Sequence, residues 1–366
     1  MLNPGQIPQQ EPIISVGIVL PEDDTQSLQL KLPDNIQYQL KWDEKAAILA
    51  TGTRLSVQLL DDGLTTTINN NSENITVKKV IEISPEKIDF DRIAPQSGIL
   101  LKNVITGRNF HWKKRIDIHL PGSIIIKRID NTLLLINRVP LESYLMCVAT
   151  SEMGAVSPPA LIEAQTIAAR SWLLCAAERK HNELGIDACN DDCCQRYQGT
   201  THLSKQSIAG AQNTKGMVLL YEGKICDARY SKSCGGMTEA YQNIWQGEPI
   251  PYLSALPDIP NVKNITPLNN EKAFRKWITN PPTAFCSPQI IPEKNLKQYL
   301  GSVDETGHYY RWRIELKQQD LVKNINLHFK LNVAIITDLI PLKRGASGRI
   351  TKLKLQYKNK KNKDKE

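Results

Sequence analysis

The sequence of 366 residues predicts an α+β fold, in which a β-rich N-terminal region leads into a mixed α/β core built around a pair of helices. Strand-like segments, several of them with clear alternation of apolar and polar residues, follow one another from Ile13 to about Val139, and turns rich in Asp, Asn, Gly and Pro separate them. Apolar residues at helical spacing then begin at Leu141. This change of period places the junction between strands and helices near residue 140.

The expected elements can be given in chain order. Strands are predicted over 13–20, 27–32, 36–42, 54–60, 75–83, 115–129 and 132–139. A helix over 200–214 and a hairpin around Glu222-Gly223 follow the helical pair. Further helices are expected over 271–278 and 292–300, a strand leading into a helix over 311–326, and a strand over 345–357. We divide the chain into a flexible lead (1–12), the β-rich region (13–105), the core (106–258), an extension completing the core (259–355) and a charged tail (356–366).

The helical pair ends its first helix at a glutamate. Leu141, Tyr144, Leu145 and Val148 form an apolar stripe, and Glu152 falls where this stripe ends. Pro140 suits the first helical position, and Ser157-Pro158 the start of an alanine-rich second helix. The negative end of the helix dipole and partial burial would both raise the pKa of this carboxyl group. A glutamate protonated near neutral pH can act as a general acid, whereas the alternative is a surface glutamate at a helix end.

The segment ACNDDCCQRYQGTT carries candidate metal ligands. Cys189, Cys193 and Cys194 supply three thiols within six residues, and His181 lies a short way upstream. Structural zinc takes thiolate and imidazole ligands in a tetrahedral arrangement. Because adjacent cysteines ligate one ion only with strain, Cys189 with Cys194 is the better pair. A disulfide or free thiols remain the alternative.

An aromatic and basic segment, His111-Trp112 followed by Lys113 and Lys114, also precedes the core. It is either a sugar-binding patch, with an aromatic platform beside cations, or the edge of a strand with a half-buried tryptophan. We favour the second interpretation.

Composition limits the classes of function. The formal net charge is +8, which suits contact with an anionic polymer such as nucleic acid, a membrane face or a cell wall. No nucleic-acid-binding motif is visible, so we expect no nucleic-acid partner. No apolar run approaches the ~18 residues of a transmembrane segment. The N-terminal residues have neither the cationic start nor the apolar stretch of a signal peptide.

Four motifs in the core resemble those of one known family. They are Y-L-x-x-V-x-x-S-E-M from Tyr144, E-A-x-x-I-A-A-R-S from Glu163, C-x(4)-C-Q-x-Y-x-G from Cys189, and S-x-G-G-x-T-E from Ser233. Together they resemble the SpoIID/LytB family, which comprises stage II sporulation protein D and the amidase enhancer proteins. The resemblance is specific from Leu141 to Asp258, about a third of the chain.

The resemblance implies a peptidoglycan lytic transglycosylase that cleaves the MurNAc-GlcNAc bond of glycan strands, with Glu152 as its catalytic acid. It further implies structural zinc bound by the cysteine–histidine group, a location in the cell envelope, and a cell-wall amidase as a partner. The substrate-binding residues that it implies are Arg170, Gln195, Tyr197, Ser233, Gly235 and Gly236. A core tyrosine at 197 and an ordinary glycine turn at 233–236 are the alternatives.

One family feature is absent from the sequence. The resemblance leads us to expect a C-terminal G-H-G-x-G-x-S-Q-x-G-A motif, and this sequence has none. Two alternatives to the enzyme therefore stay open. One is a non-catalytic glycan-binding protein that stimulates a separate amidase, and the other is an inactive, truncated family member. No motif links the chain to spore formation itself.

Overall fold

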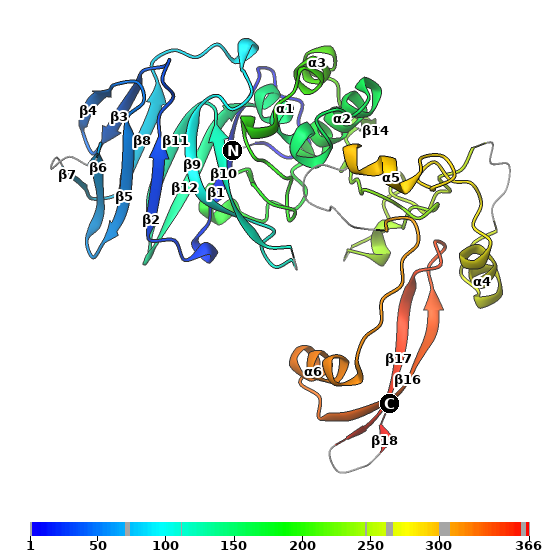
Figure 1. The fold of residues 1–366 in the computed structure, drawn as a ribbon. Helices are drawn as coiled ribbons and strands as arrows, with labels where there is room; N and C mark the ends of the chain where they lie inside the picture. Colours follow the sequence, from blue (N-terminus) through cyan, green and yellow to red (C-terminus); the bar gives the residue numbers. More distant parts are fainter. Residues whose placement is uncertain are drawn as a thin grey trace. The chain divides into compact units, whose positions relative to one another are not determined.

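The structure is a computed structural model, and it describes residues 2–69, 74–110, 112–245, 247–260, 266–299, 308–359 and 364–365. It has the α+β fold predicted from the sequence (Figure 1). The chain divides into two compact units. The first unit comprises Met1–Tyr230 with Lys297–Glu305, and the second unit comprises Ser231–Leu296 with Thr306–Glu366.

Two sheets form most of the first unit. One runs in the order β13-β1-β12-β11-β8-β3-β4, and the other in the order β10-β9-β2-β5-β6-β7. Neighbouring strands are antiparallel except β1 and β13, which are parallel. The strands of the first sheet are β1 (Ile13–Val19), β3 (Tyr38–Trp42), β4 (Lys45–Leu49), β8 (Val80–Pro85), β11 (Ser123–Ile129), β12 (Thr132–Pro140) and β13 (Ala188–Cys189). Those of the second are β2 (Ser27–Lys31), β5 (Arg54–Leu60), β6 (Gly63–Ile68), β7 (Asn74–Val77), β9 (Ile99–Thr106) and β10 (Lys114–Leu120).

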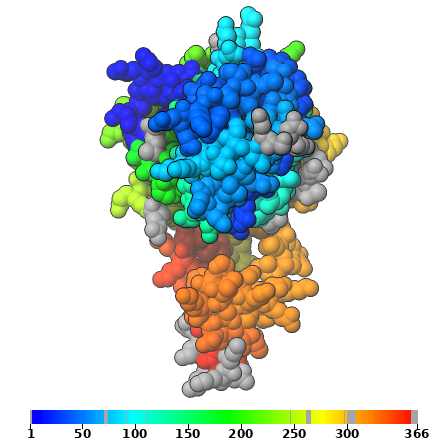
Figure 2. Space-filling view, turned by 90° about the vertical axis from the view of Figure 1, so that its left-hand side faces the viewer, coloured from blue at the N-terminus to red at the C-terminus, as the bar shows by residue number. Residues whose placement is uncertain are grey.

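One hydrophobic core unites the two sheets. Alternate side chains of the strands point inward, as Leu28 and Leu30 do in β2 while their neighbours face solvent. Ile18 of the first sheet and Val57 of the second are fully buried in the same cluster. The outward side chains of the early strands form the continuous blue and cyan surface in Figure 2. Burial of these apolar side chains stabilises the β-rich region.

Three helices follow β12 in the first unit. They are α1 (Leu141–Glu152), α2 (Pro159–Cys175) and α3 (Lys205–Asn213), and they lie together beside the ends of the strands (Figure 1). Helix α1 is buried over almost its whole length, and its buried residues include the polar Glu142, Ser143, Thr150 and Ser151 beside the apolar stripe. Pro140 precedes its first turn, and α2 begins at Pro159 with Pro158, not Ser157, at the N-cap. The predicted start at 157–158 is therefore one residue too early.

Several other predicted elements need correction. The predicted strand over 75–83 is two strands, β7 and β8, because the chain turns between Val77 and Val80. The predicted helix over 200–214 is a 3₁₀ turn followed by α3, whose N-cap Ser204 begins the helix anew. The segment 311–317 forms no strand, and in the described part of the chain it has no strand neighbour. The predicted hairpin is confirmed as β14 (Leu220–Tyr221) and β15 (Lys224–Ile225).

The second unit is built from short helices and a small sheet. Its elements are α4 (Glu271–Thr279), α5 (Glu293–Leu296), α6 (Gln318–Phe329), β16 (Val333–Arg344), β17 (Ile350–Asn359) and β18 (Asp364–Lys365). Strand β17 lies between β16 and β18 in one antiparallel sheet. Among the described residues, none of the helices has the length and apolar character needed to cross a membrane.

Candidate active site

Glu152 is the last residue of α1, and two donors meet one oxygen of its carboxyl group. The backbone N–H of Arg196 donates to Oε1 over 2.8 Å, and the hydroxyl of Tyr230 donates to the same atom over 3.2 Å. The side chain is half-buried. Among the described residues both hydrogen bonds end on Oε1, so Oε2 is the atom left to carry a proton.

The surroundings of Glu152 raise its pKa. Burial is the main cause, because it disfavours the charged carboxylate, and the charge of Asp192 acts in the same direction. The hydrogen bonds from Arg196 and Tyr230 and the charge of Arg196 oppose this effect but do not cancel it. The rise in pKa predicted from the sequence is therefore confirmed. A carboxyl group in this state can hold a proton at a pH where an ordinary glutamate has lost it.

The chain from Gln195 to Gly199 runs past the end of α1 and fixes this geometry. Alternate backbone N–H groups face the helix, because Gln198 donates to Ser151 Oγ over 3.1 Å while Arg196 donates to Glu152. Gly199 has φ +56°, and a Cβ atom there would lie 1.9 Å from the carbonyl oxygen of His119. Only glycine fits so close to a neighbouring backbone. This explains the glycine of the C-x(4)-C-Q-x-Y-x-G motif.

Gln195 orients the tyrosine that contacts Glu152. Its Oε1 accepts a hydrogen bond from Tyr144 over 3.0 Å, and its Nε2 donates to the carbonyl of Ala169 over 3.2 Å. The same Nε2 donates to the hydroxyl of Tyr230 over 3.3 Å. Because Tyr230 accepts from Gln195, its own proton points toward Glu152. Gln195 is fully buried, so in this structure it supports Tyr230 from the protein interior.

Arg170 and Tyr197 also lie in the interior. The guanidinium of Arg170 in α2 pairs with Glu142 of α1 over 2.5 Å and also donates to the carbonyl of Met217. Tyr197 stacks on Tyr144 and donates to Asn137 Oδ1 over 2.7 Å. Both side chains are fully buried, which agrees with the core-tyrosine alternative for residue 197. In this structure they hold α1, α2 and the strands together.

The side chain of Arg196 joins Glu152 to an aromatic pair. Its guanidinium forms a two-point ion pair with Asp192 and lies 4.8 Å from the ring centre of Trp112. Trp112 is half-buried and stacks on Phe110, whose exposed fraction is 45%. His111 lies outside the described residues. The arrangement places an accessible aromatic face beside the residue whose backbone binds the carboxyl group.

Ser233, Gly235 and Gly236 belong to the second unit. Ser233 is half-buried and its Oγ accepts a weak hydrogen bond from the N–H of Gly235. Gly236 has φ +96°, and a Cβ atom there would lie 3.0 Å from the ring of Trp277. The paired glycines thus allow a tight turn over the aromatic ring.

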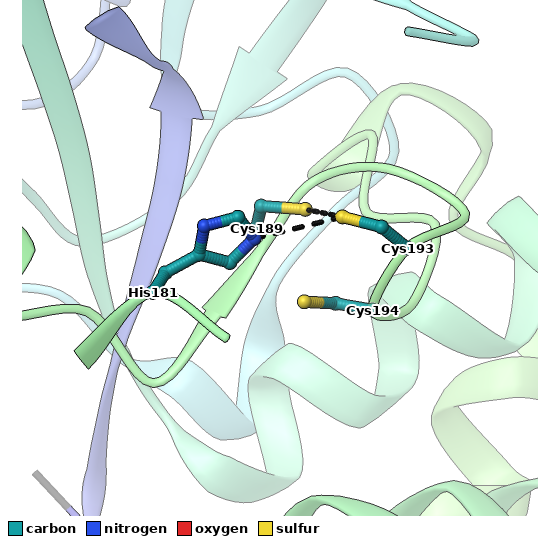
Figure 3. A group of neighbouring side chains, drawn as sticks. All are labelled: His181, Cys189, Cys193 and Cys194. Atoms are coloured by element: carbon teal, nitrogen blue, oxygen red, sulfur yellow. Dashed lines mark hydrogen bonds between the residues drawn. The ribbon is translucent and has the colours of Figure 1, made fainter. Parts of the chain in front are cut away.

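His181, Cys189, Cys193 and Cys194 form one cluster in the first unit (Figure 3). Their ligand atoms all lie within 4.8 Å of one another. Cys193 Sγ is 3.0 Å from Cys189 Sγ and 3.5 Å from His181 Nε2. The sequence argument favoured Cys189 with Cys194, whereas the structure brings Cys193 closest to Cys189. The turn after Cys189 bends the chain back, because the N–H of Cys194 donates to the carbonyl of Asp191. Three thiols and an imidazole can hold a metal ion.

The cluster is fixed by strand pairing and by a buried carboxylate. Cys189 lies in β13, which pairs with β1. Asp191 accepts hydrogen bonds from the N–H groups of Gly107 and Arg108 over 2.9 and 2.6 Å. Hydrogen bonding to Cys193 raises the pKa of His181 to about 10, and hydrogen bonds from Cys189 and Cys194 hold the pKa of Cys193 well below its ordinary value. The thiolate is the form of cysteine that binds a metal.

Two regions of the chain match known protein families. Residues 129–221 match the family described as SpoIID, stage II sporulation protein. The chain contains a SpoIID domain. Residues 239–365 match a domain of unknown function (DUF8618).

Curated relatives share the SpoIID region. The chain is 35% identical to the amidase enhancer of Bacillus subtilis over 111 residues, which are 30% of this chain and 14% of that protein. It is 29% identical to stage II sporulation protein D of the same organism over 153 residues, 37% of this chain and 43% of that protein. An uncharacterized protein of Brachyspira hyodysenteriae is 27% identical over 155 residues, 42% of each chain. The chain thus spans less than half the length of these relatives.

Two residues that contact Glu152 were not singled out from the sequence. Arg196 occupies the variable position of the Q-x-Y run, and its contribution is a backbone N–H that every residue except proline has. Tyr230 lies three residues before Ser233, the first residue of the S-x-G-G-x-T-E motif. A tyrosine so close to a motif was the available signal, but its contact spans 78 residues of sequence.

Proposed function

We propose that the chain is a peptidoglycan lytic transglycosylase with Glu152 as its acid and base. The observation that carries this proposal is the half-buried carboxyl group of Glu152, whose pKa is raised and whose Oε1 is held by Arg196 and Tyr230. The SpoIID domain supports the proposal, because enzymes of this family cleave peptidoglycan. We further propose a location outside the cytoplasm, where such glycan strands lie.

The proposed reaction needs one carboxyl group used twice. Protonated Glu152 donates its proton to the oxygen that bridges the MurNAc and GlcNAc rings, and the bond from that oxygen to C1 of MurNAc breaks. The 6-hydroxyl of the same MurNAc then attacks C1, and the Glu152 carboxylate takes its proton. The products are a GlcNAc end and a 1,6-anhydroMurNAc end, with no water consumed and Glu152 again protonated.

The acidic residue next to this site is already engaged. Most glycosidases use two carboxyl groups, one as acid and one as base or nucleophile. Asp192 raises the pKa of Glu152 through its charge, but both of its oxygens are bound by the guanidinium of Arg196. This pairing favours a reaction in which an internal hydroxyl group, not an activated water, attacks the sugar.

Other residues take supporting roles in the proposal. Tyr230 and Gln195 orient Oε1, so that the proton on Oε2 faces the glycan. The exposed ring of Phe110, stacked on Trp112, offers an apolar face for a sugar ring. Ser233, Gly235 and Gly236 are proposed as glycan contacts from their motif alone. Arg170 and Tyr197 are proposed to act through the positions of the helices.

We also propose zinc as the ion of the cluster formed by His181, Cys189, Cys193 and Cys194. Three thiolates and one imidazole are a donor set that zinc prefers, and a site with four protein ligands is structural. Bound zinc would fix the turn that leads from β13 into Gln195 and Arg196. The residues of the cluster would thereby position the backbone N–H that binds Glu152.

Digestion of purified glycan strands tests the enzyme proposal. Strands with and without stem peptides are incubated with wild-type protein, Glu152→Gln and Glu163→Gln, and the products are identified by mass spectrometry. Glu163 is a matched control, because it is a half-buried glutamate on α2 that accepts a hydrogen bond from Asn213. Wild type and Glu163→Gln should release 1,6-anhydroMurNAc ends, and Glu152→Gln should be slower by about 10²–10⁴-fold. Equal activity of folded Glu152→Gln and wild type would rule out this role.

A second candidate function rests on the relative named amidase enhancer, to which residues of this chain are 35% identical over 111 residues. In this alternative the chain binds glycan and stimulates a separate cell-wall amidase. The two functions differ in products. The chain alone releases anhydro ends if it is an enzyme, whereas as an enhancer it releases nothing by itself and increases the peptide release of an added amidase.

A further inference from the structure

A second group of side chains of the types that ligate metals lies in the second unit. Cys234, Asp258 and Cys286 place their ligand atoms within 4.8 Å of one another. Cys234 Sγ is 3.8 Å from Cys286 Sγ and 3.4 Å from Asp258 Oδ2. Asp258 and Cys286 lie 24 and 52 positions after Cys234 in the sequence, so chain proximity does not force the three residues together. All three side chains are half-buried.

The separations fit a tetrahedral metal centre. Zinc binds thiolate sulfur at about 2.3 Å and carboxylate oxygen at about 2.0–2.2 Å, so ligands at tetrahedral angles stand about 3.8 Å apart for two sulfurs and about 3.6 Å apart for sulfur and oxygen. The observed 3.8 and 3.4 Å are close to both values. A disulfide would instead require the two sulfurs to approach by about 1.8 Å more.

Main-chain hydrogen bonds hold the three segments in register. The N–H of Asp258 donates to the carbonyl of Gly236 over 3.0 Å, and the N–H of Phe285 donates to the carbonyl of Asp258 over 3.0 Å. Met237 and Pro257 form a further bridge between the first two segments. The ligands therefore extend from a backbone frame that is already bonded, which is the condition for a preorganised metal site.

Arginine side chains hold the same loop from another side. Arg349 Nη2 donates to the carbonyl of Cys234 over 2.9 Å, and Arg311 Nη1 donates to the carbonyl of Gly235 over 2.9 Å. Both contacts use backbone oxygens, so the cations fix the loop without occupying the thiols or the carboxylate. The ligand atoms remain available for an ion.

A metal ion at these residues would stabilise the second unit, whose hydrophobic core is small. In the described residues, the large hydrophobic cluster belongs to the first unit, and the buried apolar side chains of the second unit are Met237, Ala240, Leu268, Ala284, Tyr310, Val333 and Ile336. Small cores of this kind are commonly supported by a metal or by disulfides. A metal ion bound by ligands from three separate segments stabilises the folded unit most, because the one ion then links all three segments.

We propose that Cys234, Asp258 and Cys286 form a second metal site, which binds a divalent cation of the zinc class through two thiolates and one carboxylate. Three protein ligands leave a fourth position for water or an external ligand. The site lies in the second unit, whereas the cluster of His181 and its cysteines lies in the first, so the two bind metal independently. The proposal does not depend on the glycan reaction.

The test follows each thiol separately in the full chain. Protein is freed of metal under reducing conditions and treated with iodoacetamide, either without zinc or with zinc added in excess over the protein. The alkylated peptides are then quantified by mass spectrometry. Zinc should slow alkylation of Cys234 and Cys286 by at least about tenfold, because a metal-bound thiolate is a poorer nucleophile. Cys175, a half-buried thiol outside both clusters, is the internal control and should react equally in both samples.

Metal content of variants gives the second measurement. Wild type, Cys286→Ser, Asp258→Asn and the control Cys175→Ser are loaded with zinc, freed of excess and analysed for zinc per chain. Cys286→Ser and Asp258→Asn should each hold one equivalent less than wild type and Cys175→Ser. Equal alkylation of Cys234 and Cys286 with and without zinc would overturn the proposal. So would a disulfide between these two residues in protein isolated without reductant. The alkylation result stands even if a variant fails to fold.

Discussion

The hydroxyl of Tyr230 donates a 3.2 Å hydrogen bond to Oε1 of Glu152, the oxygen that also accepts from the backbone of Arg196. This bond stabilises the ionised carboxylate and thus lowers the pKa of Glu152, against the larger effect of burial. The balance of the two effects decides at which pH the proposed acid still carries its proton. Tyr230 is therefore a means of adjusting that balance without changing the carboxyl group.

Tyr230→Phe should raise the pKa of Glu152 further, because it removes a hydrogen bond that favours the charged form. The alkaline limb of the pH profile of kcat/KM for release of anhydro ends should move to higher pH. Gln195 keeps its bond to the carbonyl of Ala169, so the fold should survive. Tyr221→Phe, at an exposed hairpin position, is the control and should leave the limb in place. A shift to lower pH would contradict the proposed role of Tyr230.

The raised pKa of Glu152 also predicts how stability depends on pH. The folded state keeps the proton of Glu152 above the ordinary glutamate pKa of 4.5, where the unfolded state has released it. Stability contributed by this group is full below that pKa and is lost as pH rises through the folded pKa. Glutamine does not titrate, so the melting temperature of Glu152→Gln minus that of wild type should increase with pH across this window. Glu163→Gln is the control for the loss of a half-buried carboxyl group elsewhere in the first unit. A difference in melting temperature for Glu152→Gln that stays constant with pH would contradict the prediction.

Several of the strands predicted from the sequence show clear alternation of apolar and polar residues. Strand β2 has this pattern and was found, whereas β4, β6 and β9 were missed. Residues 63–68, GLTTTI, alternate weakly, and their strand forms because β5 supplies hydrogen-bond partners along its length. The opposite error occurred at 311–317. There Trp312 and Ile314 alternate well but are 71% and 65% exposed, and no described strand pairs with them.

The residues of the candidate site also fall into two groups, those that the sequence pattern indicates and those that only the structure brings together. The end of an apolar stripe located Glu152 at the helix terminus, because helical period is visible in sequence. The three thiols of the first cluster were also visible, since they lie within six residues, and His181 lies eight positions before Cys189. The contacts of Tyr230 and Arg196 were not visible, because they depend on how segments far apart in sequence pass the end of α1. The pairing of Cys234 with Cys286 was hidden for the same reason.

Gly199→Ala should destabilise the first unit more than a glycine replacement usually does. Its backbone, at φ +56° and ψ −143°, lies in a region that essentially only glycine occupies, which costs alanine about 1–3 kcal/mol. A Cβ atom 1.9 Å from the carbonyl of His119 adds a backbone clash of about 1–3 kcal/mol. Gly185→Ala is the control for an ordinary left-handed glycine, because Gly185 has φ +72° and ψ 31° and nothing within 4 Å of the added atom. Urea unfolding of both variants measures the difference. Equal losses would mean that the backbone strain and the close approach at Gly199 both relax freely.

Arg170→Met should separate a positioning role from a glycan-binding role. The buried guanidinium pairs with Glu142, and its removal leaves that carboxylate uncompensated, at a cost of about 3–5 kcal/mol in unfolding free energy. The double variant Glu142→Gln/Arg170→Met removes both charges and should recover much of the loss. Because Arg170 is fully buried, the KM of the folded double variant for glycan strands should match that of wild type. A raised KM in a double variant of restored stability would instead show that Arg170 contacts the glycan.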